Sequence, residues 1–252
     1  MTEKSSYLPG EPIWVDLATP NIEVSNRFYE SLFGWTAGEQ SGEEFGGYAI
    51  FTKDGKKVAG IVPLMFEGQP AVWSCYVSTD DAEKTAAKVT EAGGSLHAPP
   101  MAVAELGTMA ICVDPTGGYF GIWQPGEHTG AELIDAEGTM SWIELATRDQ
   151  KAALPFYASV FGWDAHVGDG YTEFQLGGRS VAGCMDMPPM VPAEVGAYWM
   201  PYFAAEDPAA QAEKAVSLGG SVLVPFMEMA EVAFSVVADP HGSAFGLLKL
   251  KG

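Results

Sequence analysis

Two acidic residues stand beside tryptophan in matching stretches of the chain. IWVDLAT places Asp16 two positions after Trp14, and SWIELAT places Glu144 two positions after Trp142. Both stretches alternate apolar and polar residues, which is typical of half-buried strands and puts each acid on the same face as its tryptophan. A carboxylate in such a place is partly desolvated, which raises its pKa unless a donor pairs with it. It could act as a general base, anchor a ligand hydroxyl or amine, or serve as a structural acceptor for backbone amides or a neighbouring tyrosine.

Aromatic residues on or beside other predicted strands could line a pocket together with these acids. Their flat faces can stack on a ligand and their polar tips can form hydrogen bonds, although a place in the core is the ordinary alternative for a strand tryptophan. The candidate ligand-binding residues are Trp14, Tyr48, Trp73, Tyr76 and Trp123 in the first half of the chain, and Trp142, Tyr171, Trp199 and Tyr202 in the second. Tryptophan, methionine and one acid together suit a pocket for a planar organic molecule.

These matching contexts belong to a repeat that spans the chain. FYESLFGW at Phe28–Trp35 answers FYASVFGW at Phe156–Trp163, and DPTGGYFG from Asp114 answers DPHGSAFG from Asp239. The matches keep their order across both halves, which indicates a tandem duplication of one domain. We therefore predict a first domain over residues 8–125 and a second over residues 138–252. Residues 126–137 between them are rich in Gly and acids and lack apolar periodicity, so they are predicted to be a linker.

Each half carries the signals of elements that would position these side chains. The eight-residue stretches Phe28–Trp35 and Phe156–Trp163, which we call the octets, each predict the inner face of a helix. Gly34 or Gly162 would end that helix by adopting the left-handed conformation. The aromatic residues of the octets are assigned to packing. KDGK around Asp54 and GGR around Gly178 predict hairpin turns. Each half is thus predicted to run β-α-β-β-β twice, giving an α+β domain whose mainly antiparallel sheet curves around a cavity with helices outside.

Composition limits the partners. The chain has 252 residues and a formal charge of −20, from 33 acids and 13 bases. Such a charge repels phosphate backbones and anionic lipid surfaces, so neither nucleic acid nor a membrane is an expected partner. MTEKSSYLPG does not read as a secretory signal, and no apolar stretch is long enough to cross a bilayer. The odd, widely spaced set Cys75, Cys112 and Cys184 argues against a disulfide framework, which favours a cytoplasmic location.

The motifs W-x-D/E-L-x-T, FY-x-x-x-FGW and DP-x-G-x-x-x-G resemble the vicinal oxygen chelate superfamily. This superfamily includes glyoxalase I, extradiol dioxygenases and bleomycin-resistance proteins, and the chain is most similar to its tandem two-domain members. The resemblance covers nearly the full chain. It also implies a built-in dimer of the two domains, because in single-domain relatives two chains share the sites.

The resemblance implies a divalent metal in catalytic members, held by His on the first strand, His or Glu on the fifth and Glu on the eighth. Carried onto this chain, those positions fall on Trp14 and Trp142, on Trp73-Ser74 and Trp199-Met200, and on Gly121 and Gly246. Indole, thioether and glycine cannot replace these ligands. The four histidines, His97, His128, His166 and His241, are predicted on a strand end, the linker, a loop and a turn, without ligand-type spacing.

Two functions from different classes follow. The first is metal-independent binding, or sequestration, of a small hydrophobic and aromatic molecule, with no cofactor, as in the bleomycin-resistance branch. The second is an enzyme of the same superfamily (a lyase, isomerase, hydroxylase or dioxygenase). It would use a rearranged divalent metal site, or Asp16 and Glu144 as catalytic acid and base.

Overall fold

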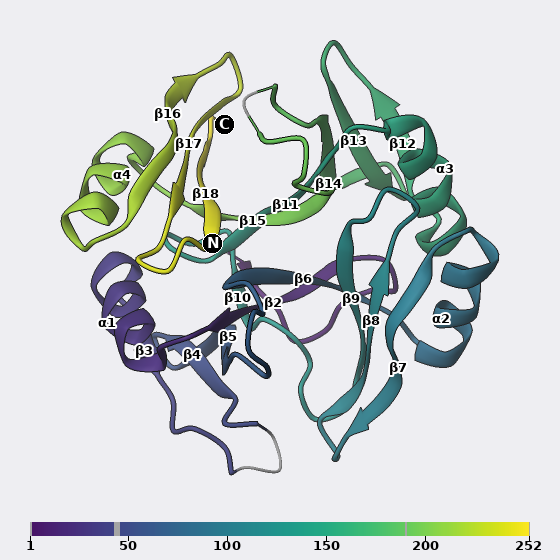
Figure 1. The fold of residues 1–252 in the computed structure, drawn as a ribbon, viewed down its shortest axis with the longest axis horizontal. Helices are drawn as coiled ribbons and strands as arrows, with labels where there is room; N and C mark the ends of the chain where they lie inside the picture. Colours follow the sequence, from purple (N-terminus) through teal and green to yellow (C-terminus); the bar gives the residue numbers. More distant parts are fainter. Residues whose placement is uncertain (1, 43–45, 190, 252) are drawn as a thin grey trace.

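A computed structural model describes residues 2–42, 46–189 and 191–251, which form two eight-stranded sheets and four helices (Figure 1). The first half contains β2 (Pro12–Thr19), α1 (Ile22–Phe33), β3 (Thr36–Ala37), β4 (Ala49–Lys53), β5 (Lys56–Pro63), β6 (Val72–Ser78), α2 (Ala82–Glu91), β7 (Ser95–Val103), β8 (Gly107–Val113) and β9 (Tyr119–Pro125). The second half contains β11 (Met140–Thr147), α3 (Gln150–Phe161), β12 (Asp164–Val167), β13 (Tyr171–Leu176), β14 (Arg179–Asp186), β15 (Tyr198–Ala204), α4 (Pro208–Ser217), β16 (Ser221–Glu228), β17 (Val232–Ala238) and β18 (Ala244–Leu250). A short pair, β1 (Thr2–Glu3) and β10 (Leu133–Ile134), joins the N-terminus to the connection between the halves.

Each sheet consists of two β-α-β-β-β modules side by side, as predicted from the repeat. The strand order is β3-β4-β5-β2-β6-β9-β8-β7 in the first sheet and β12-β13-β14-β11-β15-β18-β17-β16 in the second. The first strands of the two modules pair antiparallel at the sheet centre, β2 with β6 and β11 with β15. This register sets Asp16 opposite Ser74, and Glu144 opposite Met200. The predicted α+β class with curved, mainly antiparallel sheets is confirmed.

Local chemistry explains where the elements end. Gly34 and Gly162 end α1 and α3 with φ of 71° and 72°, the left-handed conformation that glycine adopts at low cost. Asp54 and Gly55 both have positive φ, 51° and 75°, as a tight two-residue hairpin requires. One local expectation was wrong, because His166 lies in strand β12 and not in a loop. The pairing of β12 with β13 supplies the backbone hydrogen bonds that favour the strand there.

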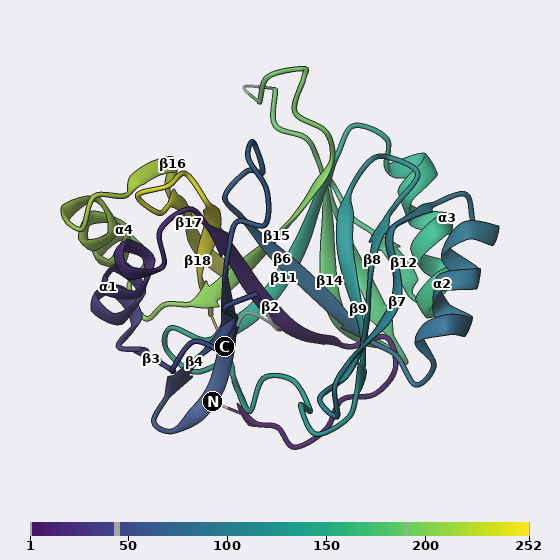
Figure 2. The ribbon, with the colours of Figure 1, turned by 60° about the horizontal axis from the view of Figure 1, so that its bottom comes forward.

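The two octets build the core between the halves. The Tyr29 hydroxyl donates to Asp239 of the second half at 3.1 Å, and the Tyr157 hydroxyl donates to Asp114 of the first at 2.7 Å. Phe245 of the second half packs against the ring of Tyr29. Helix α1 lies beside α4, and α2 lies beside α3 (Figures 1 and 2). The octets therefore pack as predicted, and they hold the two sheets together.

The connection between the halves is a packed segment. Ala131, Leu133 and Ala136 within residues 126–137 are buried, and Glu132 accepts a hydrogen bond from the backbone of Lys57. The absence of apolar periodicity, which predicted a linker, therefore did not mean an absence of packing.

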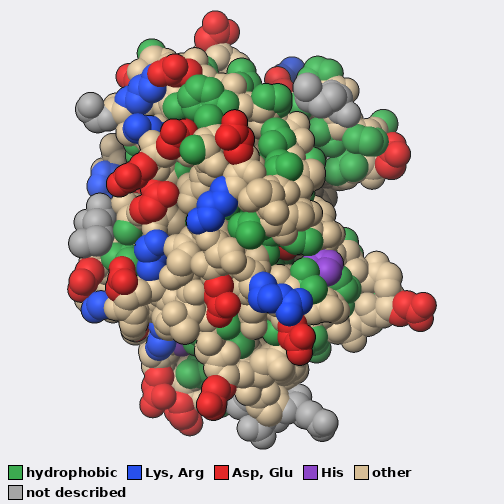
Figure 3. Space-filling model, turned by 90° about the vertical axis from the view of Figure 1, so that its left-hand side faces the viewer, with side chains coloured by type: hydrophobic (Ala, Val, Ile, Leu, Met, Phe, Trp, Pro, Cys, Tyr) green, Lys and Arg blue, Asp and Glu red, His purple; other side chains and the backbone are tan. Residues whose placement is uncertain are grey.

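Acidic side chains are spread over the face that α1 and α4 share, with basic ones between them (Figure 3). No helix in the described part of the chain is long and apolar enough to span a membrane.

Candidate ligand-binding site

The concave face of the first sheet holds a hydrogen-bonded group around Asp16. The indole Nε1 of Trp14 donates to the hydroxyl of Tyr48 at 2.7 Å, and this hydroxyl donates to Asp16 at 3.4 Å. Tyr76 and Ser74 on the neighbouring strand β6 also stabilise the ionised carboxylate and so act to lower its pKa. Asp16 is only 8% exposed. It is therefore enclosed by its donors and lies beneath the surface of the face.

The second sheet repeats this arrangement with glutamate. The Nε1 of Trp142 donates to the Tyr171 hydroxyl at 2.9 Å, and the Tyr202 hydroxyl donates to Glu144 at 2.8 Å. The Tyr171 hydroxyl also stabilises the ionised form of Glu144 and so acts to lower its pKa. Each half thus carries one tryptophan, two tyrosines and one carboxylate in the same spatial arrangement. We call this group of four side chains the carboxylate network.

Glycines in the sheet make room for the tyrosines of each network. A Cβ on Gly121 would overlap the ring of Tyr76, and a Cβ on Gly60 would overlap the hydroxyl of Tyr48. Gly246 and Gly183 stand in the same relation to Tyr202 and Tyr171. The tyrosines reach the carboxylates because the sheet has no side chain at these positions, which leaves space for the rings of Tyr76 and Tyr202 and for the hydroxyls of Tyr48 and Tyr171.

Burial dominates the acid–base behaviour of both networks. It raises the pKa of Asp16 to about 6, although Tyr76, Ser74 and Tyr48 donate to the carboxylate and oppose the shift. Burial likewise raises the pKa of Glu144, against the donors Tyr171 and Tyr202. Both pKa values are therefore raised although each acid has donors, which differs from the expectation that a paired donor would prevent the rise.

The structure separates two of the candidate aromatic residues from the rest. Trp14, Tyr48, Tyr76 and Trp123 lie on the first concave face, and Trp142, Tyr171 and Tyr202 lie on the second. Trp73 and Trp199 instead face the core between the halves, where their Nε1 atoms donate to Tyr29 at 3.1 Å and to Tyr157 at 2.7 Å. The expectation that they line a cavity was wrong, because successive strand residues point to opposite faces.

Several residues on the concave faces were not among the candidates. Tyr198, Met200, Phe234 and Leu248 line the second face. Strand alternation could have found them, since Tyr198 and Met200 share the parity of Tyr202, and Leu248 follows Gly246 by two positions. His128 is predicted to lie in the linker, but the structure places its ring against Trp14, with ring centroids 4.4 Å apart. No local sequence pattern predicts that the segment with His128 folds back onto the sheet.

The side chains at the superfamily's metal positions do not fit a divalent ion. Trp14, Ser74 and Gly121 stand there in the first half, and Trp142, Met200 and Gly246 in the second. A glutamate at position 121 would collide with Tyr76. Within residues 2–42, 46–189 and 191–251, no three His, Cys, Asp or Glu side chains gather as a metal site requires. Asp16 and Glu144 each accept a hydrogen bond from a tyrosine, and a single carboxylate on each face is a poor chelator.

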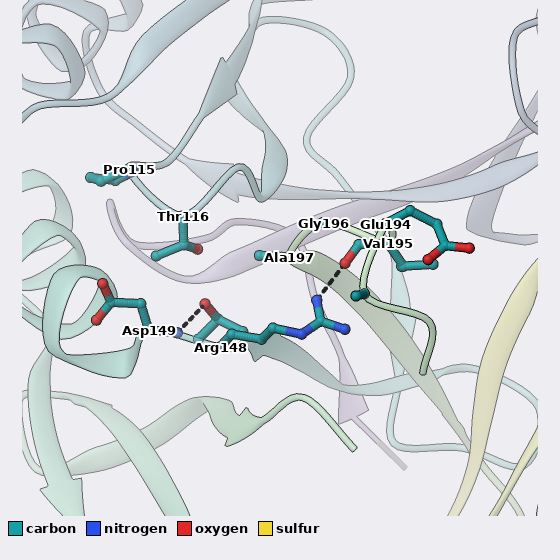
Figure 4. A pocket seen from close by; sticks show the side chains of 10 residues that line it. Pro115, Thr116, Arg148, Asp149, Glu194, Val195, Gly196 and Ala197 are labelled. Carbon is teal, nitrogen blue, oxygen red and sulfur yellow. Dashed lines mark hydrogen bonds between the residues drawn. The ribbon is translucent and has the colours of Figure 1, made fainter. Parts of the chain in front are cut away.

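A hollow of about 250 Å³ lies elsewhere, between the turn at Pro115 and Thr116 and the loop 193–197 (Figure 4). Arg148 at its floor donates to the backbone carbonyls of Val191, Pro192 and Val195. Its guanidinium therefore fixes the loop, and Asp149 and Glu194 line the hollow together with small residues such as Ala193.

Comparison with known families agrees with the duplicated architecture. Residues 12–120 match the family model described as the glyoxalase/bleomycin resistance protein/dioxygenase superfamily, and residues 142–248 match a glyoxalase-like domain. CFP32 of Mycobacterium tuberculosis (strain CDC 1551 / Oshkosh), whose name describes a candidate glyoxylase, is 36% identical over 99% of this chain and 98% of its own. The anthracycline biosynthesis protein DnrV of Streptomyces peucetius is 35% identical over 97% of this chain and 95% of its own.

Solved structures share the fold at low identity. The Mn(II)-bound glyoxalase from Novosphingobium aromaticivorans has a TM-score of 0.65 and 16% identity, with 95% of this chain and 82% of that chain covered. The 2,3-dioxygenase LapB from Pseudomonas sp. KL28 has a TM-score of 0.67 and 13% identity, with 96% and 93% covered. Taken with the relatives that align over almost their whole length, the chain belongs to the glyoxalase/bleomycin resistance protein/dioxygenase superfamily, also called the vicinal oxygen chelate superfamily, in its tandem two-domain form.

Proposed function

We propose that the chain binds a small, planar, hydrophobic molecule on the concave face of its second sheet, without a resident metal. The observation that carries the proposal is the set of partly exposed aromatic side chains on this face, namely Trp142, Tyr198 and Phe234. Met200 and Leu248 add adaptable apolar surface between them. Flat aromatic faces over an apolar floor favour a planar guest.

The carboxylate network supports binding by shaping this floor. Glu144 is 6% exposed and accepts a hydrogen bond from Tyr202, and Tyr171 also stabilises its ionised form. Because the acid lies beneath these phenols, its role in the proposal is to hold their rings in place. Polar groups that are already paired with one another leave few hydrogen bonds for a ligand, so apolar contact supplies most of the affinity.

The relatives supply a chemical class for the guest. DnrV and DauV, at 35% and 34% identity, are named as anthracycline biosynthesis proteins. Anthracyclines are planar, fused-ring aromatic compounds, which matches the shape that the second face favours. We therefore extend the proposal to oxygenated polycyclic aromatic molecules as the ligand class.

Matched alanine substitutions test the proposal. Phe234 on β17 pairs with Leu248, and Met109 on β8 holds the equivalent place in the first half, opposite Trp123. The probe is 1,8-dihydroxyanthraquinone. Its binding is measured as quenching of tryptophan fluorescence in the presence of a metal chelator. Loss of one aromatic contact worth about 1–1.5 kcal/mol predicts that Phe234→Ala weakens binding roughly tenfold. Met109→Ala is the control and should leave the affinity unchanged; equal effects of the two variants, or no saturable binding by the native protein, would contradict the proposal.

Acid–base catalysis is the second candidate, and the raised pKa values of Asp16 and Glu144 favour it. A group whose pKa is raised by burial can hold a proton near neutral pH and deliver it. Chemical conversion of the probe by the native protein, seen by mass spectrometry and lost in Glu144→Gln, would support this function. An unchanged probe mass after long incubation supports binding alone.

A further inference from the structure

Residues 126–131 fold back over the first concave face, and we name them the cap segment. The indole Nε1 of Trp123 donates to the carbonyl of His128 at 2.8 Å. The backbone N–H of Ala131 donates to the carbonyl of Ile13 on β2 at 2.9 Å. Backbone groups in the middle and at the C-terminal end of the cap segment are therefore tied to strands of the first sheet.

The imidazole of His128 lies between two tryptophans. Its ring centroid is 4.4 Å from that of Trp14, at 86° between planes, and 5.5 Å from that of Trp123, at 61°. His128 is 8% exposed, and neither of its ring nitrogens has a hydrogen-bond partner among the described residues. Burial lowers the pKa of His128 to about 4, with a further lowering by Lys57, so the ring is uncharged at neutral pH.

An unpartnered, buried imidazole is unusual, because a buried polar atom that makes no hydrogen bond costs free energy. The ring here contributes its flat shape and its edge contacts with two indoles. These are the contacts that a small aromatic ligand would make in the same place. The orphaned nitrogens thus point to a slot that selects a planar ring rather than a particular hydrogen-bonding group.

The second half lacks this arrangement. Trp142, the counterpart of Trp14, is partly exposed, whereas Trp14 is 4% exposed. Leu248 stands where the first half has Trp123, so one wall of the slot is aliphatic. The two halves therefore present one slot closed by the chain itself and one that is accessible.

We propose that the imidazole of His128 is a built-in occupant of an aromatic-binding slot between Trp14 and Trp123. The chain consequently binds one planar aromatic molecule instead of two, and removing the His128 ring creates a second site for a small, uncharged, single-ring aromatic compound. This inference rests on the proposed function, because it assumes that the second face is the native site. It adds that the first face is also suited to a planar aromatic ring but binds no ligand, because the His128 ring already fills the slot.

Protein labelled with 5-fluorotryptophan reports each site separately by fluorine NMR, with resonances assigned through single Trp→Phe variants. The probe is 4-methylphenol. In the native protein, the Trp142 resonance is expected to shift in a saturable manner while that of Trp14 stays in place. In His128→Gly, the Trp14 resonance should shift as well. His128→Phe keeps a ring in the slot and should behave as the native protein does.

The outcomes separate the two proposals. A native protein whose Trp142 resonance moves with neither 4-methylphenol nor 1,8-dihydroxyanthraquinone would contradict the proposed function. A saturable Trp14 shift in the native protein or in His128→Phe would overturn the built-in occupant. The same holds for an unmoved Trp14 resonance in His128→Gly that is folded by circular dichroism. His128→Ala provides the same opening with a less flexible backbone should the glycine variant not fold.

Discussion

Trp14 of the first half is 4% exposed and packs against His128, whereas Trp142 of the second half is partly exposed. Beneath these two residues the halves are alike, since each tryptophan donates to a tyrosine, Tyr48 or Tyr171, whose hydroxyl stabilises the ionised carboxylate. The duplication has therefore kept the buried layer of each concave face and changed the residues above it. The buried layer supports the sheet, and the residues above it determine which face a ligand can reach.

The similarity of the buried layers can be tested with the glycines beneath the tyrosines. Gly121→Ala and Gly246→Ala each place a methyl group where Tyr76 or Tyr202 lies. Overpacking and a displaced donor to a buried carboxylate together predict a loss of about 3 kcal/mol in the free energy of unfolding for each variant. Gly196→Ala, where a Cβ meets nothing within 4 Å, is the control. Urea denaturation measures all three; a large loss in only one half would mean that the networks are not equivalent.

The next largest effect concerns pH. The pKa of Asp16 is about 6 in the folded protein against a model-compound value of 3.8, so the folded state binds this proton more tightly. Asp16 thus contributes stability that is fully present below pH 4 and is lost as the pH rises through 6. At about 1.4 kcal/mol per pKa unit, the contribution is roughly 2–3 kcal/mol.

Asp16→Asn should remove this pH dependence, so the unfolding free energy of the variant should fall less than that of the native protein between pH 4 and pH 7. Glu144→Gln should change the profile in the same direction, because burial raises the pKa of Glu144 too. Chemical denaturation at intervals of half a pH unit makes the measurement. A profile of Asp16→Asn parallel to that of the native protein would show that the carboxylate does not titrate in this range.

Much of the architecture follows from the sequence because the repeat and the local signals agree. The αL glycines Gly34 and Gly162 and the hairpin at Asp54 are determined within a few residues, and the structure has them where predicted. The alternation of side chains between the two faces of each strand could also be predicted from the sequence. Trp73 and Tyr76 lie three positions apart on β6, so they could not both face the cavity.

Long-range placement is what the sequence does not contain. His128 lies in a segment without periodicity, and only the folded chain brings it against Trp14. The bond from Tyr29 to Asp239 joins residues 210 positions apart. Local pattern predicted that Tyr29 would be packed, but the identity of its partner depends on how the two halves dock.

The smallest expected effect distinguishes tryptophans on the concave faces from tryptophans in the core behind them. Trp73→Phe and Trp199→Phe remove the donors to Tyr29 and Tyr157, at a cost of about 1–2 kcal/mol each in the free energy of unfolding, while leaving a ring in the core. Neither residue reaches a concave face, so the affinity for 1,8-dihydroxyanthraquinone should not change. Trp142→Phe loses a similar hydrogen bond but lies on the second face, so it should alter that affinity. Because the three substitutions are chemically identical, a change in probe binding by Trp73→Phe would mean that ligands reach the core side of β6 and would place the site elsewhere.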